Sequence, residues 1–555
     1  MKKILLLSLL LPWTLSFASA KHGFFADTWE SRPLPDLSIT TSKATSTGTP
    51  ALTFSINTQD SIQRVLPGIF ANNTNPWLGT RLLTDEDYGL EHLRQAKIPF
   101  LRLPGGNWTN KFLWDGTIHW DLTHNFADSI QGRPRQTWTF TADEMIDLAL
   151  KIGAEPQICV NFSLARFIPG PDSVEQAAHY AANWVRHVKE KGLKVRFWEV
   201  GNENYGSWQA GWSVNGDTIT GEDYGRGFAI FVDSMKAADP TIKIGAVVLE
   251  QDNGRQSGGH RYWMRQMLPH IQDKADFLAY HEYFTWEPDI NDVTVDDMLN
   301  SIDMIGKAKD SIHAMVGRYT NKAPDHFPLT VTEYNVRAGL KDNQAISAIY
   351  NAMALGEFMR HGYGLINLWN IANGYHEVTG DQGMLTESRP DVRNYTPHPN
   401  FYNYYLYQKM WGDFMLKSTP VNHDRVRCYA SAFADGSVSL VIINAQNKAE
   451  TAKVKLENYT HTNIAYGYTF SAPSPTSEKV FLNDQGGEDF GPLNYAEIPP
   501  WEMNIASEPV FDLPPWSIQH IIVRSSGASV PLKLPKQKYK PENELRFDLL
   551  GRNYN

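Results

Sequence analysis

Two short segments, far apart in the chain, each place a carboxylate where an enzyme could use it. The segments are Gly201-Asn202-Glu203 and Thr332-Glu333-Tyr334. Each directly follows a run of apolar residues of strand length, so each glutamate is expected at the end of a buried strand. Two carboxylates that face each other can divide nucleophilic attack and acid–base catalysis between them. We predict that Glu203 and Glu333 form such a catalytic pair.

The chemistry that this pair suits best is hydrolysis of a glycosidic bond with retention. That reaction needs carboxyl groups about 5–5.5 Å apart: one attacks the anomeric carbon, and the other protonates the departing oxygen and then activates water. Asn202, beside Glu203, would donate to a sugar hydroxyl. Glu199 is interpreted as structural, and the further acids Glu250 and Glu282 lack a matching partner. A single glutamate at a strand end is more often a solvated loop residue, so the prediction depends on the two segments occurring together.

Arg102 follows Phe100 and Leu101 in another apolar run, so its charge requires a partner. A carboxylate of the predicted pair is the natural one. A nearby cation would lower the pKa of that carboxylate and keep a nucleophile ionised. The following Pro104-Gly105-Gly106 indicates a turn in which glycine permits a positive φ or a close approach of backbone.

Aromatic side chains at other strand ends are candidates for holding a sugar. His281 and Tyr283 share one face of a strand, and Tyr283 would donate a hydrogen bond to the nucleophile. His281 taken alone is more often a core residue. Core packing is likewise the default for each tryptophan, but four of them follow strand ends and could stack on sugar rings: Trp108, Trp114, Trp208 and Trp369.

Short apolar runs alternate with stretches of helical periodicity over most of the chain. Eight runs read as strands: Leu66–Phe70, Ile98–Leu103, Pro156–Phe162, Val195–Val200, Ile242–Leu249, Asp276–Tyr283, Leu329–Tyr334 and Leu365–Trp369. Between them lie six stretches of helical length: Asp85–Ala96, Ala142–Ile152, Val174–Lys189, Tyr224–Ala238, Met298–Tyr319 and Gln344–Arg360.

Strands without strict alternation, each followed by a helix, indicate a parallel sheet buried on both faces. Eight such units over roughly 300 residues match a TIM (β/α)8 barrel better than a doubly wound sheet. The Gly-rich phosphate turn of the doubly wound fold does not follow the first run. We therefore predict an α/β fold with such a barrel, whose catalytic groups lie at the C-terminal ends of the strands.

The pattern changes after Asn400, where short β-rich runs separated by turn signals indicate an additional antiparallel β-sandwich. We expect residues 61–400 to form the barrel and residues 401–525 the sandwich. Residues 21–60, rich in Thr and Ser, are expected to add strands to the sandwich, and residues 526–555 read as a polar extension.

The first residues resemble an export signal. Lys2 and Lys3 precede an apolar run, and Ala18-Ser19-Ala20 resembles a cleavage site, so residues 1–20 are predicted to be a signal peptide. This predicts a secreted or periplasmic protein. No later segment is long and apolar enough to span a membrane.

Composition excludes several functional classes. The net charge of the 555 residues is -10 without a long basic run, so nucleic acid and anionic lipid are not expected partners. The two cysteines, Cys159 and Cys428, cannot form a disulfide framework, although one bond between them stays open. No Cys or His cluster has metal-ligand spacing, so a metal site is not expected.

At these residues the sequence resembles glycoside hydrolase clan A, and most of all family 51, the α-L-arabinofuranosidases. The family's Arg-x-Pro-Gly-Gly-Asn turn is matched by Arg102 to Asn107. Its Gly-Asn-Glu segment with a following Gly-x-Trp is matched by Gly201 to Trp208, its His-x-Tyr by His281 to Tyr283, and its Glu-x-Asn by Glu333 to Asn335. The resemblance spans roughly Gly68 to Trp369.

The resemblance implies that Glu203 is the acid/base and Glu333 the nucleophile. It also implies that Arg102, Asn107, Asn202 and Tyr283 shape the subsite for the sugar whose bond is cut. The predicted substrate-binding residues also include Asn72, Trp208, His281 and Trp369. The family needs no metal or organic cofactor.

One departure affects specificity. Asn72 occupies the position at which the family usually has a Glu that binds the terminal sugar, and an amide donates as well as accepts. The leading hypothesis is an α-L-arabinofuranosidase that acts on arabinose-containing polysaccharides or oligosaccharides. The alternatives are a β-xylosidase or endo-β-glucanase of the same clan, a catalytically inactive carbohydrate-binding protein, and a metal-dependent barrel enzyme.

Overall fold

The computed structural model describes residues 23–116, 139–252, 262–285, 287, 289–488 and 492–527, together with two short strands at 546–547 and 553–554. The predicted signal peptide, residues 1–20, lies outside the described residues. None of the described helices combines the length and the hydropathy that crossing a membrane requires.

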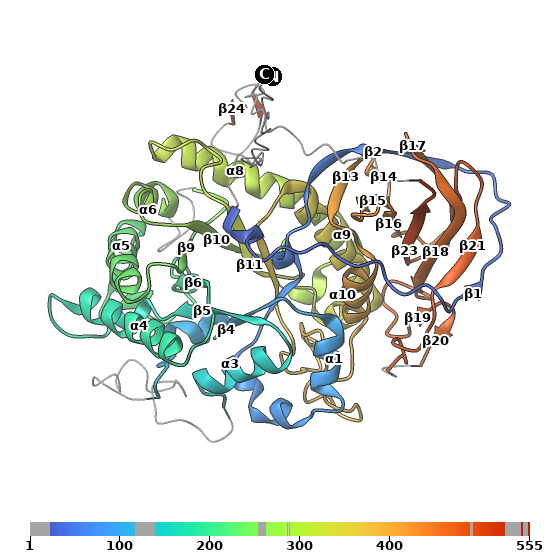
Figure 1. Cartoon of the computed structure of the whole chain (residues 1–555). Coiled ribbons are helices and arrows are strands. Elements are labelled where there is room, and N and C mark those ends of the chain that lie inside the picture. Colours follow the sequence, from blue (N-terminus) through green and yellow to red (C-terminus); the bar gives the residue numbers. More distant parts are fainter. Residues whose placement is uncertain are drawn as a thin grey trace, which may run out of the picture.

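Eight parallel strands close into a barrel, which confirms the predicted α/β barrel (Figure 1). The last strand pairs with the first through Asn367 opposite Ala71, so the ring has no free edge. In chain order the strands are β3 (Ala71–Asn73), β4 (Phe100–Leu103), β5 (Glu155–Val160), β6 (Phe197–Val200), β9 (Lys243–Val247), β10 (Phe277–Glu282), β11 (Leu329–Tyr334) and β12 (Leu365–Leu368).

The first barrel strand lies later in the chain than predicted. Leu66–Phe70 was expected to be this strand, but Pro67–Phe70 forms the 3₁₀ helix η2 and the strand is Ala71–Asn73. The reason is Pro67, because proline has no backbone N–H for a strand ladder and its fixed φ suits a helical turn. The strand therefore ends in two buried asparagines, Asn72 and Asn73.

Helices surround the barrel (Figure 1). The predicted stretch Met298–Tyr319 is split into two helices, and the helices at 263–271 and 399–410 were not predicted. The α-helices are α1 (Gly89–Ala96), α3 (Ala142–Lys151), α4 (Ser173–Glu190), α5 (Gly221–Ala238), α6 (Trp263–Ile271), α7 (Val295–Ser301), α8 (Met304–Tyr319), α9 (Ala345–His361) and α10 (Pro399–Met410). Short 3₁₀ helices are η1 (Gly23–Ala26), η2, η3 (Pro76–Leu78), η4 (Thr80–Thr84), η5 (Gly106–Lys111), η7 (Ser163–Arg166), η9 (Ile290–Asp292) and η10 (Gly339–Asn343).

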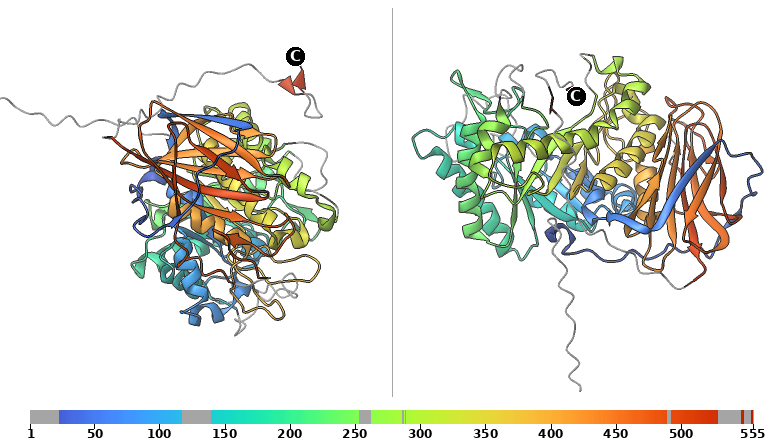
Figure 2. Two further views of the ribbon diagram at one scale, coloured as in Figure 1. Left: turned by 90° about the vertical axis from the view of Figure 1, so that its right-hand side faces the viewer. Right: turned by 90° about the horizontal axis from the view of Figure 1, so that it is seen from above.

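A second domain is built around one large, mainly antiparallel sheet, which confirms the predicted sandwich beside the barrel (Figure 2). Its strands, in spatial order, are β1 (Thr41–Ser42), β21 (Trp501–Asn504), β18 (His461–Ser471), β23 (Ser517–Ser525), β16 (Val438–Asn444), β15 (Val426–Ala432), β13 (Phe414–Thr419), β2 (Leu52–Arg64), β17 (Glu450–Glu457) and β22 (Val510–Leu513). The short strands β14 (Asn422–His423), β19 (Phe481–Leu482) and β20 (Gln485–Gly486) add to this sheet. Separate two-stranded sheets are formed by β7 (Ser213–Val214) with β8 (Asp217–Thr218) and by β24 (Arg546–Phe547) with β25 (Asn553–Tyr554).

The chain enters the sandwich before it builds the barrel. β2 lies between β13 and β17, antiparallel to the first and parallel to the second, although both follow the barrel in sequence. Residues before and after the barrel therefore share one sheet.

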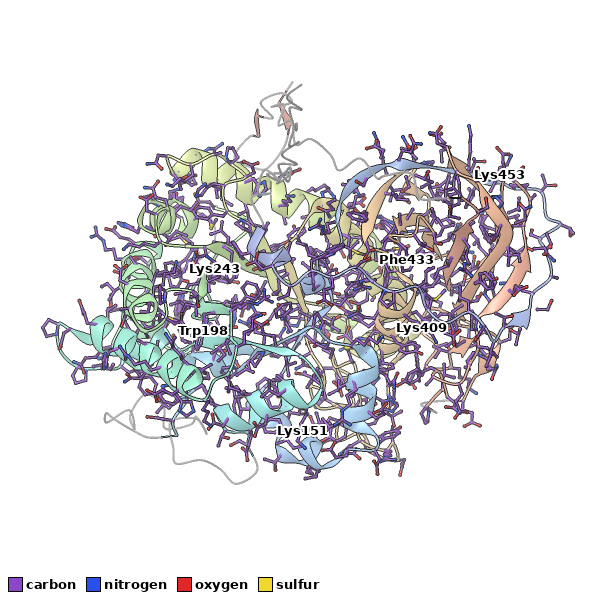
Figure 3. The ribbon with its side chains drawn as sticks, viewed as in Figure 1. Lys151, Trp198, Lys243, Lys409, Phe433 and Lys453 are labelled. Carbon is purple, nitrogen blue, oxygen red and sulfur yellow. The ribbon has the colours of Figure 1, made fainter. Side chains whose placement is uncertain are left out.

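Helices α9 and α10 lie between the barrel and the sandwich (Figure 1). Every residue from Ala345 to Met359 is buried, because α9 has the barrel on one side and the sheet on the other. Phe433 joins the same hydrophobic core as Trp198 of barrel strand β6 (Figure 3). The two domains thus share a continuous core.

A buried ion pair crosses this interface. Glu357 of α9 accepts hydrogen bonds from Tyr429 Oη at 2.8 Å and from Arg427 Nη1 at 3.1 Å, both on β15, and it also pairs with Arg360. Burial alone would raise the pKa of Glu357, but its contacts with His361, Arg360 and Tyr429 outweigh burial and lower the pKa to about 2. The charged form of Glu357 is therefore favoured by folding.

We expect Glu357→Gln to lower the free energy of unfolding by about 3 kcal/mol near neutral pH, because two arginines lose a buried partner. A carboxylate with a depressed pKa stabilises the fold above its unfolded pKa and loses that effect as the pH falls through its folded pKa. The difference between wild type and variant should therefore shrink between about pH 4.5 and pH 2. Urea unfolding at several pH values measures it.

The matched control is Glu222→Gln, which removes an exposed pair with Arg226 one helical turn away. Its effect should be below about 0.5 kcal/mol at any pH. Equal and pH-independent losses in both variants would show that the buried pair does not stabilise the interface.

Candidate active site

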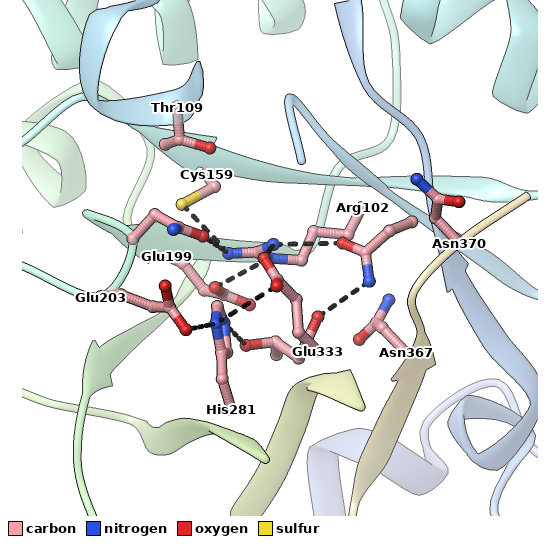
Figure 4. Close-up of polar contacts among 12 residues, drawn as sticks. Arg102, Thr109, Cys159, Glu199, Glu203, His281, Glu333, Asn367 and Asn370 are labelled. Carbon is pink, nitrogen blue, oxygen red and sulfur yellow. Dashed lines mark hydrogen bonds and ion pairs between the residues drawn. The ribbon is translucent and has the colours of Figure 1, made fainter. Parts of the chain in front are cut away.

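Residues from four strand ends gather at one edge of the barrel (Figure 4). Arg102 lies in β4, His281 in β10 and Glu333 in β11, and Glu203 follows the end of β6. Because all eight strands are parallel, their C-terminal ends share that edge. The side chains of these four residues meet there.

The guanidinium of Arg102 is fully buried at the centre of the site. Its Nε donates to Glu199 Oε2 at 3.0 Å, and its Nη1 donates to Glu333 Oε1 at 3.0 Å. Its Nη2 donates to Asn202 Oδ1 at 2.9 Å. The carboxylate partner predicted for Arg102 is present, and Glu199 provides a second one.

Polar residues on neighbouring strands complete this network. Asn73 Oδ1 accepts from Arg102 Nη1 at 3.1 Å. Gln157 Nε2 donates to Glu199 Oε1 at 2.6 Å, and Asn367 Nδ2 donates to Gln157 Oε1 at 3.1 Å. Asn73, Gln157 and Asn367 were not among the predicted site residues. Gln157 and Asn367 are polar side chains inside apolar strands, and that pattern is the signal that could have found them. Asn73 lies among polar residues and gives no such signal.

The carboxylate of Glu333 is held at both oxygens. Arg102 occupies Oε1, and Tyr283 Oη donates to Oε2 at 3.0 Å. The predicted hydrogen bond from Tyr283 to this carboxylate is therefore made. The residue is 3% exposed, so its two oxygens have fixed directions.

Glu203 is held more loosely and from one side. It has a positive φ of 45°, which turns the chain directly after β6. Trp208 Nε1 and Gln209 Nε2 donate to its Oε2 at 2.6 Å and 2.9 Å, so Oε1 points into the site. The indole of Trp208 packs so closely on Gly206 that a Cβ there would lie 2.5 Å from a ring atom, which explains the Gly-x-Trp spacing.

His281 lies between the two glutamates. Its Nδ1 is 3.2 Å from Glu203 Oε1 and 3.6 Å from Glu333 Oε2, and its Nε2 is 3.2 Å from Thr332 Oγ1. One carboxylate oxygen of each glutamate and one ring nitrogen of His281 all lie within 4.8 Å of one another. The glutamates therefore converge on one small volume.

Burial and contacts shift the pKa values of Glu333 and Glu203 in opposite directions. Burial raises the pKa of Glu333, and the charge of Glu203 adds to this effect, whereas His281, Arg102 and Tyr283 lower it without reversing the result. Burial also acts to raise the pKa of Glu203, but contacts with His281, Trp208 and Gln209 outweigh it and lower the pKa. The expectation that Arg102 would leave Glu333 with a lowered pKa is wrong, because desolvation is the larger effect.

Two residues expected at the site make other contacts. Asn72 is fully buried, and its Nδ2 donates to Met384 Sδ while its Oδ1 accepts from the N–H of Asn73. The side chain that reaches Arg102 is that of Asn73. Asn107 is exposed at the start of η5. The buried asparagine of this helix is Asn110, whose Nδ2 donates to Gln209 Oε1 at 2.8 Å.

Trp369 covers the double-glycine turn after β4. A Cβ on Gly105 would lie 2.9 Å from its ring, and a Cβ on Gly106, whose φ is +69°, would lie 2.6 Å from it. Trp77 and Trp108 extend the aromatic surface. The ring centroid of Trp77 lies 6.0 Å from that of Trp369 and 5.1 Å from that of Trp108. Glycine is required in this turn both for its backbone conformation and for lack of space.

Comparison with known proteins agrees with the motifs. Residues 92–289 match the family model described as alpha-L-arabinofuranosidase 1 domain. An intracellular exo-alpha-(1->5)-L-arabinofuranosidase of Streptomyces lividans is 26% identical over 47% of this chain and 39% of its own length. The corresponding protein of Halalkalibacterium halodurans is 25% identical over 35% of this chain and 38% of its own. The chain thus spans about two fifths of the length of these relatives.

Solved structures match over a larger share of the chain. The alpha-L-arabinofuranosidase of Thermotoga maritima, solved as an arabinose complex, has a TM-score of 0.63 at 20% identity, covering 85% of this chain and 100% of that one. A bifunctional glucanase-xylanase from a metagenome library has a TM-score of 0.60 at 15% identity, covering 86% and 100%. These matches confirm the fold, and with the family model they confirm the resemblance to family 51 of clan A.

The prediction of secretion or periplasmic export is contradicted. Relatives from Halalkalibacterium halodurans, Streptomyces lividans and Bacillus subtilis are named intracellular enzymes. A basic pair before an apolar run is a pattern that also occurs in segments that are not export signals. Cys159 and Cys428 are both free and buried, which answers the question of their pairing.

We expect Gly106→Ala to destabilise the protein and reduce turnover, because the new Cβ would displace the Trp369 ring. Gly153→Ala is the matched control, since Gly153 has a φ of +79° with nothing within 4 Å of a built Cβ. Both variants incur the cost of a left-handed residue, about 1–2 kcal/mol. Gly106→Ala should lose about 1–3 kcal/mol more from overpacking. Equal free energies of unfolding in the two variants would show that Trp369 does not constrain the turn.

Proposed function

We propose that this protein is a retaining glycoside hydrolase, and that its substrate is an α-L-arabinofuranoside. The observation that carries the proposal is the convergence of Glu203, His281 and Glu333 within 4.8 Å at the C-terminal edge of the barrel. Two carboxyl groups this close suit double displacement, in which no room is needed for a water molecule between them at the first step. Inverting enzymes need about 6.5–9.5 Å.

Glu333 is the proposed nucleophile. Arg102 and Tyr283 fix its two oxygens, so the attacking oxygen keeps one direction. The guanidinium also stabilises the ionised form, in which the carboxylate attacks the anomeric carbon. The covalent glycosyl-enzyme that results leaves the anomeric carbon bonded to a Glu333 oxygen.

Glu203 is the proposed acid/base. Its Oε1 faces the site while Trp208 and Gln209 hold Oε2, so it can protonate the departing oxygen and later take a proton from water. The first step needs the protonated form, whereas contacts in the free protein lower the pKa. A bound sugar excludes water from Glu203, and desolvation raises the pKa of a carboxyl group. We therefore place the proton on Glu203 in the complex.

Substrate contacts are proposed for residues around this pair. Asn202 Nδ2 is buried and has no hydrogen-bond partner among the described residues, while its Oδ1 is held by Arg102. It is placed to donate to a hydroxyl of the sugar beside Glu203. Trp208, 49% exposed, offers an apolar face at the rim. His281, Trp369 and Asn107 stay proposed contacts, and Asn73 replaces Asn72 as the amide of the first strand that reaches the site.

The choice of sugar has one specific competitor. The family's sugar-binding Glu is absent from β3, where Asn72 is engaged with Met384 instead. A β-xylosidase or an endo-β-glucanase stays the alternative, and solved structures named a glucanase-xylanase and a xyloglucanase share the fold with TM-scores of 0.60 and 0.56. Aryl glycosides of arabinofuranose, xylose and glucose, tested on the purified protein, decide between them. Turnover of the arabinofuranoside above the others is the expected result.

We expect Glu333→Ala to abolish turnover of an aryl arabinofuranoside, because no group remains to form the covalent intermediate. Glu203→Ala should keep the first step on a substrate with a good leaving group, and added azide should restore its turnover by replacing the activated water. Steady-state rates with and without azide measure this.

An inactive carbohydrate-binding protein would behave differently. It would bind arabino-oligosaccharides equally well before and after either substitution and would show no turnover as wild type. An unchanged rate in Glu203→Ala would remove this residue from the mechanism.

We expect Tyr283→Phe to lower kcat by at least about tenfold, because a hydrogen bond to a charged group contributes about 1.5–3 kcal/mol. KM should change less, since Tyr283 acts through the direction and charge of Glu333. The control is Tyr180→Phe, which removes a hydroxyl bonded to Asp115 away from the glutamate pair. A drop in kcat as large in Tyr180→Phe would show a general loss of stability.

A further inference from the structure

Three metal-ligand side chains meet at the candidate site. The distances from His281 Nδ1 to Glu203 Oε1 and to Glu333 Oε2 are 3.2 Å and 3.6 Å. Zinc is bound tetrahedrally by nitrogen and carboxylate oxygen at about 2.0–2.2 Å, which places ligand atoms about 3.4 Å apart. Two of the three ligand separations therefore already match a tetrahedral ion, and the third is no more than 4.8 Å.

The ring nitrogen that faces this volume lies close to both carboxylates but makes no hydrogen bond of good geometry with them. His281 is 7% exposed, and its Nδ1 is one of the buried polar atoms left without a hydrogen bond. When Nε2 donates its hydrogen to Thr332 Oγ1, 3.2 Å away, Nδ1 presents a lone pair toward two carboxylate oxygens. Such an arrangement is repulsive unless a proton on Nδ1 or a metal cation lies between the nitrogen and the carboxylate oxygens.

The charge of the cluster also calls for a cation. Three carboxylates, those of Glu199, Glu203 and Glu333, contact each other through a single guanidinium and His281. When all three are ionised and His281 is neutral, two negative charges remain uncompensated in a buried site. Unpaired buried charge is costly, and a divalent cation would neutralise this excess.

Each proposed ligand is oriented by a partner at another atom. Thr332 lies at the far nitrogen of His281, and Trp208 and Gln209 bind the other oxygen of Glu203. Arg102 binds the other oxygen of Glu333, and Tyr283 also donates to the proposed ligand oxygen, Oε2. Partners of this kind fix the direction of metal ligands in known sites.

We propose that Glu203, His281 and Glu333 bind a divalent transition-metal ion, Zn²⁺, and that this ion blocks the active site. The imidazole nitrogen favours Zn²⁺ over Mg²⁺ and Ca²⁺, which prefer oxygen ligands. Coordination would occupy the proposed nucleophile and the proposed acid/base together, so the bound form has neither. Any proton held by the ligands leaves to solvent when the ion binds. The blocking of turnover rests on the proposed function, whereas the binding itself does not.

Calorimetric titration of the full-length protein with ZnCl₂ tests the binding directly. We expect one high-affinity site in wild type and at least about tenfold weaker binding in His281→Gln, which keeps an amide near Thr332 but removes Nδ1. The matched control is His423→Gln, a half-exposed histidine of β14 in the sandwich, which should leave that site intact. MgCl₂ should give no comparable heat.

Two outcomes would overturn the proposal: no Zn²⁺ binding by wild type up to millimolar concentration, or equal affinity in wild type and His281→Gln. Glu203→Gln, with one ligand charge removed, gives a second comparison if His281→Gln fails to fold. In kinetic assays Zn²⁺ should compete with the substrate, and a chelator should restore the rate. Loss of activity on chelation with recovery on Zn²⁺ addition would instead make the metal a cofactor and would contradict the blocking role. A protein with no glycosidase activity can still be titrated, so failure of the proposed function is distinguishable.

Discussion

The structure depends on one buried positive charge. Arg102 is fully buried inside the barrel, and its guanidinium is surrounded by the side chains of Asn73, Glu199, Asn202 and Glu333. A charge in that position is tolerated only with paired carboxylates and satisfied donors, so the polar residues around it are constrained as a group. The same guanidinium that requires these partners also fixes the direction of the proposed nucleophile. Folding and function therefore share an interaction here.

The sandwich supports this arrangement from outside the barrel. After Glu333, β11 leads through η10 into α9, which lies between the two domains. The backbone N–H groups of Ala345 and Ile346, at the start of α9, donate to carbonyl oxygens of Ser477 and Pro475 in the loop between β18 and β19. Free N–H groups at a helix start need partners, and the second domain supplies them. The segment after the proposed nucleophile is thus held from both sides.

Much of the fold was predictable because its local patterns are strong. β11 has the predicted bounds, and seven of the barrel strands follow the predicted apolar runs, since strands buried on both faces are continuous apolar segments. The exceptions have local physical causes. Pro67 turned the first run into η2, and the stretch Gln344–Arg360, predicted as helical from its apolar spacing, is buried on every side over most of α9. The prediction of export, made from the pattern of the first 20 residues, is contradicted by relatives that are named intracellular.

The sequence by itself determined which strand ends carry Arg102, Glu203, His281 and Glu333, because an apolar run followed by a polar motif is a local feature. Only the tertiary structure decided that Asn73 rather than Asn72 reaches Arg102, since side chains on adjacent positions of a strand point to opposite sides. It also decided that burial raises the pKa of Glu333, and that two glutamates and a histidine with no metal-ligand spacing lie within 4.8 Å. The reason is that desolvation and three-dimensional convergence arise from segments far apart in sequence, and spacing along the chain carries no record of either.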